Sequence, residues 1–370
     1  MTYSSLVITD IDVIKVAVPM AGGGFRNAYA TYQAQQSIIV RVRSGDRVGV
    51  GNVDPLPGYS TETIDQSIDM LARKLIPAVL GQDACAIRQI GVLMDEALPG
   101  FMEAKAAIDM ACVDLITRSW SVPAYSLLGG TVKSRVRLNG WIGIVSPEQA
   151  AREAMQWKSA GFGSAKIKLG GDIRADHERV RAVRDAVGDD MELRADANAC
   201  YSVQESIALG RLLEPYRLQL LEQPVAAHDV DGLAQVRKAI GIPIMADESI
   251  TDHQSLIDVI RANAADVVKL KIMKQGGMIR CRDMMETASA AGMQIVIGHG
   301  FGLSINTQAE IMLAATSTDV LDGLECVGPL KMLDDVTTEQ LDLGQGYIDV
   351  PACPGLGLVL DNDKLTRYTL

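Results

Sequence analysis

Residues 192–249 decide the fold, and they read ELRADANACYSVQESIALGRLLEPYRLQLLEQPVAAHDVDGLAQVRKAIGIPIMADES. Three short apolar runs in this stretch each end in an acidic residue, namely Asp196, Glu222 and Asp247. Helical segments separate the runs, so the acids recur at an interval of one strand plus one helix. Such a recurrence predicts consecutive βα units with parallel strands.

The same alternation continues on both sides of this stretch. Eight apolar runs predict strands near Val136–Ile144, Ala165–Leu169, Glu192–Ala195, Leu218–Leu221, Ile242–Ala246, Val267–Ile272, Gln294–Ile297 and Gly323–Glu325. The predicted helices between them include Pro147–Ala160, His177–Val187, Val203–Leu213, Leu233–Ile240, Gln254–Ala262 and Met278–Ala291. Eight βα-type repeats over about 200 residues are typical of a barrel. A doubly wound sheet normally has a Gly-rich phosphate turn after its first strand, and none follows Val136–Ile144.

The residues before the barrel predict a smaller α+β domain. Strand-like segments (Val7–Val18, Ser37–Arg43 and Val48–Val50) precede a helical region that ends at Gly129-Gly130. The tail contains Pro354-Gly355-Leu356-Gly357, and we expect it to fold back on this first domain. The predicted division is a capping domain over 1–130, a barrel over 131–340 and a returning segment over 341–370.

Composition excludes several classes of protein. The chain has 370 residues, of which 48% are hydrophobic and 22% charged, as in a globular protein and not a disordered one. Its net charge of −11 disfavours general binding to nucleic acid or to an anionic membrane. The six cysteines form no CxxC pair, which argues against a disulfide framework or a zinc finger. No secretory signal and no apolar run of 18 residues is present, so a cytoplasmic location is expected.

The three acids predict a metal site. Strands that are neighbours in a barrel end at the same rim, so Asp196, Glu222 and Asp247 would lie side by side. Clustered carboxylates repel one another unless a cation holds them, and oxygen ligands suit Mg²⁺, with Mn²⁺ as a substitute. The alternative is that each acid separately caps the helix that follows it.

Two lysine pairs predict acid/base chemistry. Lys166 and Lys168 share one face of a strand, as do Lys269 and Lys271. Inward lysines are expensive to bury, and burial beside another ammonium lowers a lysine pKa. The alternative is that one member of each pair is exposed and only forms a salt bridge. Lys168 and Lys271 would flank a ligand on the metal, because strands two and six lie on opposite sides of the barrel.

This arrangement suggests a mechanism. The metal binds a substrate carboxylate, a lysine removes the α proton, and the metal stabilises the resulting enediolate. A second lysine returns a proton on the other face or protonates a leaving group.

At this point the chain resembles the enolase superfamily, specifically its muconate-lactonizing-enzyme subgroup. The resemblance rests on AKAAIDMACVDL (104–115), LLGG (127–130), KIK, DAN, EQP, ADES, KIMKQGG (271–277) and PGLG (354–357), in that order. The pairing of lysine with Mg²⁺ is the pattern described for that superfamily. The resemblance implies a modified (β/α)₇β barrel under an N-terminal cap that the C-terminal tail completes, and a homo-oligomer.

The resemblance also implies roles for single residues. Asp196, Glu222 and Asp247 match the Mg²⁺ ligands, and Lys168 and Lys271 match the acid/base pair. Lys166 would tune Lys168, while Asn198 and Glu248 would support the site. The cap loops 21–27 and 52–59, including Asn52 and Tyr59, would close the site and contact the substrate.

Departures from the family pattern concern the substrate. Gly51-Asn52 stands where many relatives have Gly-Glu, and Glu325-Cys326 stands where dipeptide epimerases usually have a pair of acids. Mandelate-racemase relatives pair a seventh-strand His with a sixth-strand Asp, but Lys271 occupies the sixth strand here. We therefore expect His299 to contact the substrate, and Glu325 to bind the substrate or to order a lysine. Trp141 would line the pocket or belong to the core.

The leading hypothesis is a Mg²⁺-dependent racemase, epimerase or cycloisomerase acting on a small-molecule carboxylate. The alternative within the same chemistry is dehydration of a small hydroxy acid such as a hydroxyproline. A sugar-acid dehydratase is less favoured because the His–Asp dyad is absent. From another class, a non-catalytic barrel would have no reason to keep three acids and two lysines that are costly to bury.

Overall fold

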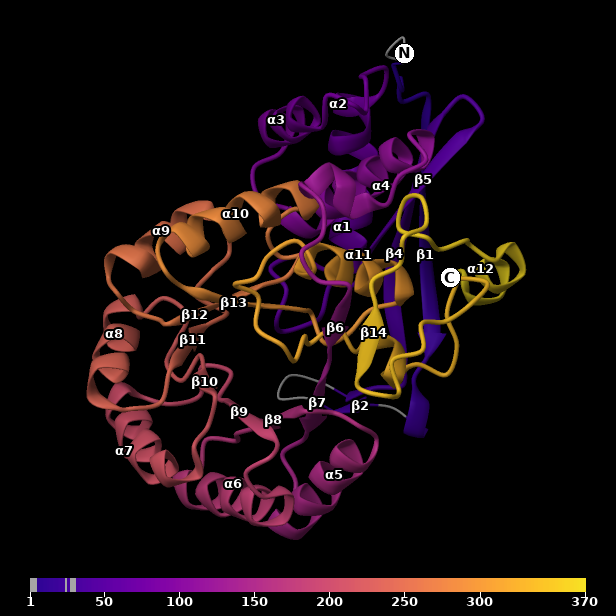
Figure 1. Cartoon of the computed structure of the whole chain (residues 1–370). Helices are drawn as coiled ribbons and strands as arrows, with labels where there is room; N and C mark the ends of the chain where they lie inside the picture. Colours follow the sequence, from indigo (N-terminus) through magenta and orange to yellow (C-terminus); the bar gives the residue numbers. More distant parts are fainter. Residues whose placement is uncertain (1–4, 24, 27–30) are drawn as a thin grey trace.

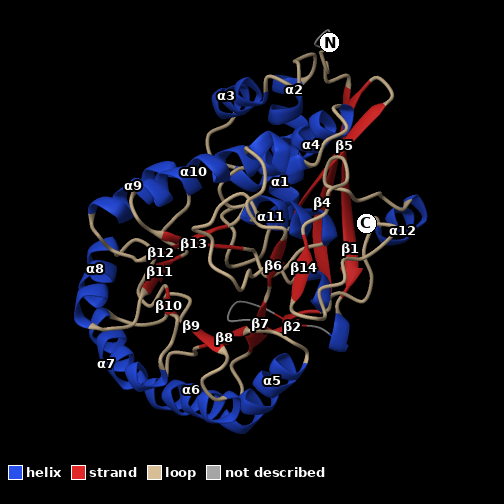
Figure 2. Ribbon diagram, in the orientation of Figure 1, coloured by secondary structure: helices blue, strands red, loops and turns tan. Residues whose placement is uncertain are grey.

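A curled sheet of seven parallel strands forms the barrel wall (Figures 1 and 2). The computed structural model describes residues 5–23, 25–26 and 31–370. The wall strands pair in chain order: β7 (Asn139–Ile142), β8 (Ser164–Lys168), β9 (Glu192–Asp196), β10 (Leu220–Glu222), β11 (Ile244–Ala246), β12 (Val267–Leu270) and β13 (Gln294–Ile297). Helices alternate with them and cover the outside: α5 (Pro147–Ser159), α6 (Ile173–Val187), α7 (Val203–Leu213), α8 (Val230–Ala239), α9 (His253–Arg261), α10 (Met278–Ala290) and α11 (Ser304–Ala314).

The barrel closes without a regular eighth strand. The predicted run Gly323–Glu325 joins β13 to the start of β7 through isolated bridges, Leu138 with Leu324 and Ile295 with Val320. The Glu325 amide donates to the Ile297 carbonyl at 3.0 Å. Gly323 has a φ of +85°, which interrupts the extended backbone that a strand needs. The segment therefore completes the wall while its backbone remains irregular.

The first predicted strand is two strands. Residues 136–144 were expected to form one strand, but β6 (Arg135–Arg137) separates from β7 at Leu138. β6 pairs antiparallel with β14 (Tyr347–Asp349) from the tail, and the Leu138 amide donates to the Gly346 carbonyl at 2.8 Å. Tertiary pairing with the tail thus overrides the continuous apolar pattern.

The cap is an antiparallel sheet covered by helices. The sheet contains β1 (Asp10–Pro19), β4 (Ala34–Ser44) and β5 (Arg47–Val53) in the order β1-β4-β5. The other cap elements are α1 (Ile64–Met70), a π-helical turn (Leu71–Leu75), α2 (Ile76–Val79), α3 (Ile87–Ala97), α4 (Met102–Ser119), and a small sheet of β2 (Phe25–Arg26) and β3 (Thr31–Tyr32). Loops were expected at 21–27 and 52–59. Gly24 and Asn27 of the first are outside the described residues, and the second begins within β5, which ends at Val53.

Helix α4 packs against β5 because glycine lets their backbones approach. A Cβ atom at Gly49 or Gly51 would lie 2.1 Å from a carbonyl oxygen of α4. Small residues on α4, such as Ala107 and Ala111, form the other side of the contact. Gly51 is therefore required by packing, and a side chain there would push the helix away.

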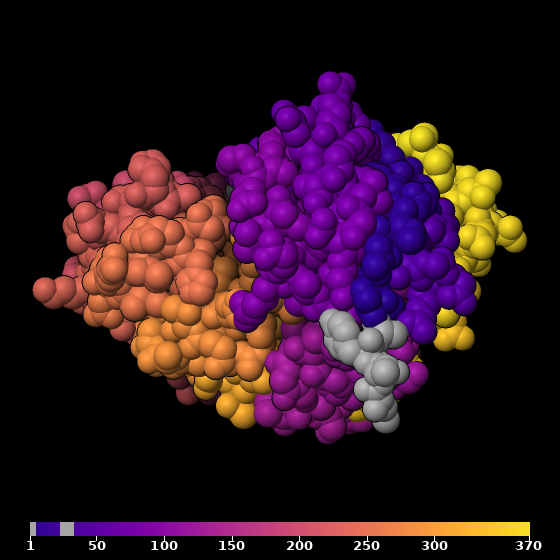
Figure 3. Space-filling model, turned by 90° about the horizontal axis from the view of Figure 1, so that it is seen from above, coloured from indigo at the N-terminus to yellow at the C-terminus, as the bar shows by residue number. Residues whose placement is uncertain are grey.

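The tail holds the cap to the barrel. Asp114 of α4 accepts hydrogen bonds from the amides of Val50 and Leu356, so the predicted PGLG turn docks on the cap's central helix. Helix α12 (Asn362–Tyr368) packs against β1, and Thr369 bridges Val16. Figure 3 shows the tail in yellow beside the indigo and purple residues of the cap.

None of the helices in the described ranges is long and apolar enough to cross a membrane.

Candidate active site

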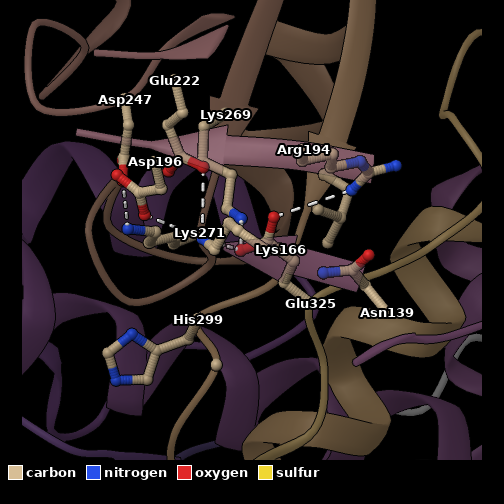
Figure 4. A network of polar contacts seen from close by, with 12 residues as sticks. Asn139, Lys166, Arg194, Asp196, Glu222, Asp247, Lys269, Lys271, His299 and Glu325 are labelled. Carbon is tan, nitrogen blue, oxygen red and sulfur yellow. Dashed lines mark hydrogen bonds and ion pairs between the residues drawn. The ribbon is translucent and has the colours of Figure 1, made fainter. Parts of the chain in front are cut away.

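Three carboxylates stand at the carboxyl ends of neighbouring barrel strands (Figure 4). Asp196 ends β9, Glu222 ends β10, and Asp247 follows β11 directly. Asp196 and Glu222 are register partners across the two strands. Each of the three is at most 2% exposed. We call Asp196, Glu222 and Asp247 the acid trio.

The acid trio does not cap the helices that follow it. The N-caps of α7, α8 and α9 are Ser202, Asp229 and Asp252, and each accepts a hydrogen bond from a backbone amide of its own first turn. The alternative interpretation of the acids as three independent caps is therefore wrong. Three buried carboxylates need some other positive partner, because burying an uncompensated charge is expensive.

Lysines approach the acid trio from two sides. Lys168, at the end of β8, donates to Asp196 Oδ2 at 2.6 Å. Lys271, directly after β12, donates to Asp247 Oδ2 at 2.7 Å. The two lysines thus contact opposite members of the trio, with Glu222 between them in the strand order.

The inner members of the lysine pairs are buried in the barrel. The Lys166 side chain is 12% exposed and lies 3.1 Å from both Asp196 and Glu222, and it also contacts Glu325. Lys269 is 0% exposed and pairs with Glu325 as well. The alternative that the lysine at the start of each strand is exposed is therefore wrong, because Lys166 and Lys269 are both held in the barrel's ion-pair network. Lys168 is 32% exposed.

Burial and charge set the pKa values in the site. Burial raises the pKa of Glu222 to about 8, and the neighbouring Asp196 adds to this rise. Burial would also raise the pKa of Asp247, but Lys271 and Lys274 hold it well below its usual range. Burial opposes the charge of Lys166, yet Glu222 and Glu325 raise its pKa well above normal. The two carboxylates therefore favour the charged form of Lys166.

Lys271 is likewise charged in this arrangement. Burial would lower its pKa, but Asp247 and then Glu248 outweigh burial and raise it above the usual value. The state of Lys271 therefore depends on whether Asp247 remains its partner.

The donor set of the trio fits a hard divalent cation. Glu222 Oε1 is buried and has no hydrogen-bond partner among the described residues, so it is an oxygen with an open position. Within residues 5–23, 25–26 and 31–370, no group of three His, Cys, Asp or Glu side chains is arranged to hold a metal ion in this structure, so the fit lies in the chemistry of the donors. Lys168 donates to Asp196 and Lys271 donates to Asp247. A metal ion would therefore compete with these ammonium groups for the same carboxylate oxygens.

Two further predicted residues support the rim. Asn198 donates through Nδ2 to Glu248 Oε1 at 3.0 Å and accepts from Lys168 at 2.7 Å. Its φ of +42° turns the chain back, and its amide donates to Asp196 Oδ1. Asn198 thereby links Lys168, the acid trio and Glu248 in one network.

Tyr59 reaches the site from the cap. Its hydroxyl donates to Asp247 Oδ1 at 3.1 Å and accepts from Lys271, whose Nζ also lies 4.2 Å from the ring centroid. Asn52, in contrast, is fully buried in the cap and donates to the carbonyl of Ile38. The structure therefore brings Tyr59 to the acid trio but does not bring Asn52 there.

His299 follows the end of β13 and is 7% exposed. Neither of its ring nitrogens has a hydrogen-bond partner among the described residues, and Figure 4 shows the ring apart from the trio. Burial first, and then Lys271 and Lys331, lower its pKa well below the usual value. The imidazole is neutral, so it offers one donor and one acceptor.

Trp141 lies in the outer wall of this rim. Its ring centroid is 4.4 Å from that of Trp157 on α5, and the Lys331 ammonium lies 4.7 Å from the Trp141 ring. Trp141 therefore lies between a helix on the outside and a cation on the inside.

Several residues of the network were not predicted from sequence. Lys274 donates to Asp247 Oδ1 at 2.6 Å, and Gln223 accepts from the amides of Asp247 and Ser249. Arg194 is fully buried and donates to the carbonyls of Gly323 and Asp322, where the barrel closes. Lys274 lies three residues after Lys271, in the turn that follows β12, and that short spacing could have revealed it. Arg194 stands two residues before Asp196 on β9, so the strand period used for the lysines could have placed it on the same face.

Two family models together match most of the chain. The model for the mandelate racemase / muconate lactonizing enzyme N-terminal domain matches residues 8–129. The model described as enolase C-terminal domain-like matches residues 149–364.

Relatives match the whole length of the chain. N-succinyl-L-Arg/Lys racemase of Bacillus cereus is 30% identical over 98% of each chain. Chloromuconate cycloisomerase of Pseudomonas putida is 32% identical over 98% of this chain and 99% of its own. The solved dipeptide epimerase of Enterococcus faecalis, complexed with Mg and the dipeptide L-Leu-L-Tyr, is 29% identical with a TM-score of 0.90, covering 96% of this chain and all of its own.

These relatives are racemases, epimerases and cycloisomerases, and all of these are isomerases acting on small molecules. The fold class expected from sequence, a modified barrel under an α+β cap, is confirmed. With both domain models matched and relatives aligned along its whole length, the chain belongs to the mandelate racemase/muconate lactonizing enzyme family of the enolase superfamily.

Proposed function

We propose that the protein is a Mg²⁺-dependent isomerase that removes the α proton of a carboxylate substrate, with Lys168 and Lys271 as the acid/base pair. One observation carries this proposal: the two lysines contact opposite ends of the acid trio, at Asp196 and at Asp247. A substrate held between them would have one ammonium or amine on each face of its α carbon. Two-sided proton transfer is what racemisation and epimerisation require.

Asp196, Glu222 and Asp247 would hold the metal ion, and Mn²⁺ would substitute for Mg²⁺. When bound, the ion supplies positive charge against the negative charge that develops on the substrate carboxylate. Lys166 contacts Asp196 and Glu222 from the strand face that it shares with Lys168. Asn198 orients Lys168, and Glu248 orients Asn198 through its amide.

Other predicted residues would contact the substrate. His299 offers unpaired ring nitrogens, and Glu325 lies beneath the trio in contact with Lys166. Tyr59 covers Lys271 from the cap, while Trp141 lines the rim near Lys331. Asn52 would act only indirectly, through its hydrogen bond to Asp54.

The reaction is tested by deuterium exchange at the α carbon. Purified protein with Mg²⁺ in D₂O is incubated with libraries of N-acylated amino acids, dipeptides, hydroxyprolines and muconates, and product masses are measured. We expect exchange with inversion or ring closure for one substrate group. A product lighter by one water would instead indicate dehydration. Absence of exchange with every acid would contradict the proposal.

Variants separate the two lysines. Lys168→Ala and Lys271→Ala should each reduce exchange from one α-carbon configuration about a thousandfold, because each lysine serves one face. Lys158→Ala is the matched control, since this lysine forms a surface ion pair with Asp190 on the barrel's outside. Equal activity of all three variants would contradict the assignment.

Metal binding has its own readout. Mg²⁺ should raise the melting temperature of the protein, and Glu222→Gln should remove that rise because it removes the unpartnered oxygen and its charge. No Mg²⁺-dependent shift together with no exchange would favour a non-catalytic barrel. The domain division at 130/131 and 340/341 and a homo-oligomeric state remain predictions, the latter to be tested by light scattering.

A further inference from the structure

The two proposed acid/base lysines lie where their strands end. Lys168 is the last residue of β8, and Lys271 follows β12, which ends at Leu270. The regular pairing of each strand with its neighbour ends at these positions. Proton transfer nevertheless requires each lysine to be held in one geometry. Some other group must therefore fix the backbone at each lysine.

A buried ion pair on α6 holds the backbone at Lys168. Asp176 is 1% exposed, and it accepts hydrogen bonds from the amides of Gly170 at 2.9 Å and Gly171 at 3.1 Å. Its partner Arg179 is also buried and donates through Nη1 to the Lys168 carbonyl at 3.3 Å. The chain that leaves β8 is thus held by two charged side chains.

The same ion pair joins this segment to the loops on either side. Arg179 Nε donates at 2.8 Å to the carbonyl of Val145, which lies between β7 and α5. The hydroxyl of Tyr201, which lies between β9 and α7, donates to Asp176 Oδ2. The backbone that carries Lys168 is therefore fixed to both neighbouring units of the barrel.

Gln275 holds the backbone at Lys271 in a different way. It is 0% exposed and lies in the turn between β12 and α10. Its Oε1 accepts from the Lys271 amide at 2.7 Å, and its own amide donates to the Lys271 carbonyl at 3.2 Å. Its Nε2 donates at 2.9 Å to the carbonyl of Ile250, in the loop after β11. Both backbone groups of Lys271 are therefore paired with one residue.

These contacts form two separate devices, and we call the Asp176–Arg179 pair and Gln275 the two backbone anchors. The first acts on β8 and the second acts on the end of β12. Three strands, β9, β10 and β11, lie between them in the sheet order. Changes at sites that share no partner have nearly independent effects, so the loss of one anchor should leave the other in place.

We propose that the backbone anchors are positioning residues, and that each aligns one lysine with one face of the substrate's α carbon. Asp176 with Arg179 serves Lys168, and Gln275 serves Lys271. This inference rests on the proposed function, because it assumes that each lysine transfers a proton on one face. The two directions of proton transfer can then be weakened separately, by changes at residues that act through the backbone.

The competing explanation is that the anchors only stabilise the loops at the barrel rim. Buried polar groups need hydrogen-bond partners in any protein, whatever its function. Loss of a merely stabilising contact would loosen the rim and lower proton transfer on both faces alike. Loss of a positioning contact lowers it on one face, so the ratio of the two rates separates the explanations.

The test compares α-proton exchange from the two configurations of one substrate. Rates are measured in D₂O with Mg²⁺ for the wild type, Asp176→Asn and Gln275→Met. Asparagine keeps the shape of aspartate but replaces one acceptor with a donor, and methionine keeps the length of glutamine without its amide. Asp266→Asn is the matched control, since Asp266 accepts from Arg237 and from the Ile244 amide at the opposite, amino end of the strands.

We expect Asp176→Asn to lower kcat about tenfold for the configuration that Lys168→Ala loses, and to change the other less than about twofold. Gln275→Met should do the reverse, with the loss at the configuration that Lys271→Ala loses. KM should change little in either variant, because both residues act through the backbone of a lysine. Asp266→Asn should keep both rates.

A second readout needs no turnover. Acetic anhydride acetylates lysines, and mass spectrometry of the digested protein gives the rate at each one. A lysine released from its anchor should react at least about twofold faster, namely Lys168 in Asp176→Asn and Lys271 in Gln275→Met. Tyr201→Phe removes only one hydrogen bond from the first anchor, so it should affect Lys168 in the same direction by a smaller factor.

Equal losses on both faces would overturn the inference in favour of the stabilising explanation, and unchanged rates in both variants would overturn it as well. If Asp176→Asn does not fold, Tyr201→Phe takes its place in both measurements. The proposed function fails separately, through absence of exchange in the wild type. In that case the acetylation rates still decide whether each anchor orders its own lysine, and identical rates in all the proteins would show that neither does.

Discussion

At the scale of single residues, the site depends on side chains that serve two partners at once. Tyr59 is the clearest case, because its hydroxyl accepts from Lys271 and donates to Asp247. A cap residue thereby controls the distance between an acid/base group and a carboxylate of the acid trio. The cap and the barrel site are therefore joined by hydrogen bonds at this position.

Tyr59→Phe should lower the rate of α-proton exchange about tenfold, because Lys271 loses its hydroxyl partner and moves more freely. The melting temperature should change little, since the ring and its contact with the ammonium remain. Exchange kinetics across pH and a thermal scan measure both effects. Tyr347→Phe, in the tail strand β14, is the control. An exchange rate equal to that of the wild type would show that the hydroxyl has no positioning role.

The site residues that recur at the spacing of strands could be predicted from the sequence. Contacts that depend on how the barrel closes could not. The acid trio recurs at one βα unit, and Lys166 and Lys168 share a strand face, so spacing alone placed them at the rim. Glu325 was expected to touch a substrate or a lysine, but its contacts with Lys269 and Arg194 depend on where the barrel closes. Those contacts join positions that are far apart in the sequence, so no local sequence pattern predicts them.

At the scale of elements, α4 connects the two domains. Its Asp109 accepts a hydrogen bond from the Met278 amide at the start of α10, where Gly277 has a φ of +125°. A Cβ at Gly277 would lie 2.3 Å from the Asp109 carboxyl group, so glycine permits the approach. A side chain of a cap helix thereby accepts a hydrogen bond from an otherwise unpaired amide in the first turn of a barrel helix. Sequence periodicity predicted both helices but not that one caps the other.

Asp109 should make stability depend on pH. Burial raises its pKa from 3.8 to about 7 in the folded protein, so the folded state binds this proton more tightly than the unfolded chain. Its contribution to stability is therefore greatest at low pH and falls as pH rises toward 7. Asp109→Asn cannot titrate but keeps an oxygen for the Met278 amide.

The free energy of unfolding of the wild type, relative to Asp109→Asn, should thus decrease by about 1 kcal/mol per pH unit between about pH 5 and pH 7. Urea titrations at several pH values measure this difference. A constant difference between the two proteins would mean that Asp109 keeps an ordinary pKa despite its burial.

At the scale of the whole molecule, one core joins cap, barrel and tail. Val16 and Ile39 of the cap sheet, Ile142 and Val268 of the barrel, and Leu356 of the tail belong to the same buried cluster. The cap's other face has its own cluster around α4. The sequence predicted a tail that returns to the cap, and α12 does so, while β14 of the same tail pairs with β6.

Leu356→Ala should destabilise the whole protein by about 2–5 kcal/mol, because it opens a cavity in the shared core. We expect a single unfolding transition that moves to lower denaturant, with cap and barrel melting together. Circular dichroism and tryptophan fluorescence are followed in the same titration. The two unfolding curves should coincide. Leu333→Ala, at a side chain that is 66% exposed, is the control. Separate transitions would show that the cap and barrel are independent.

The bridge between Val16 and Thr369 has a consequence for biosynthesis. β1 is the edge strand of the cap sheet, and residues that leave the ribosome more than 300 positions later contact it at Lys15 and Val16. Throughout translation of the barrel, that edge offers unpaired backbone groups to any other nascent chain. Chaperones should therefore bind the first 60 residues of the nascent chain, and this binding should end when helix α12 leaves the ribosome.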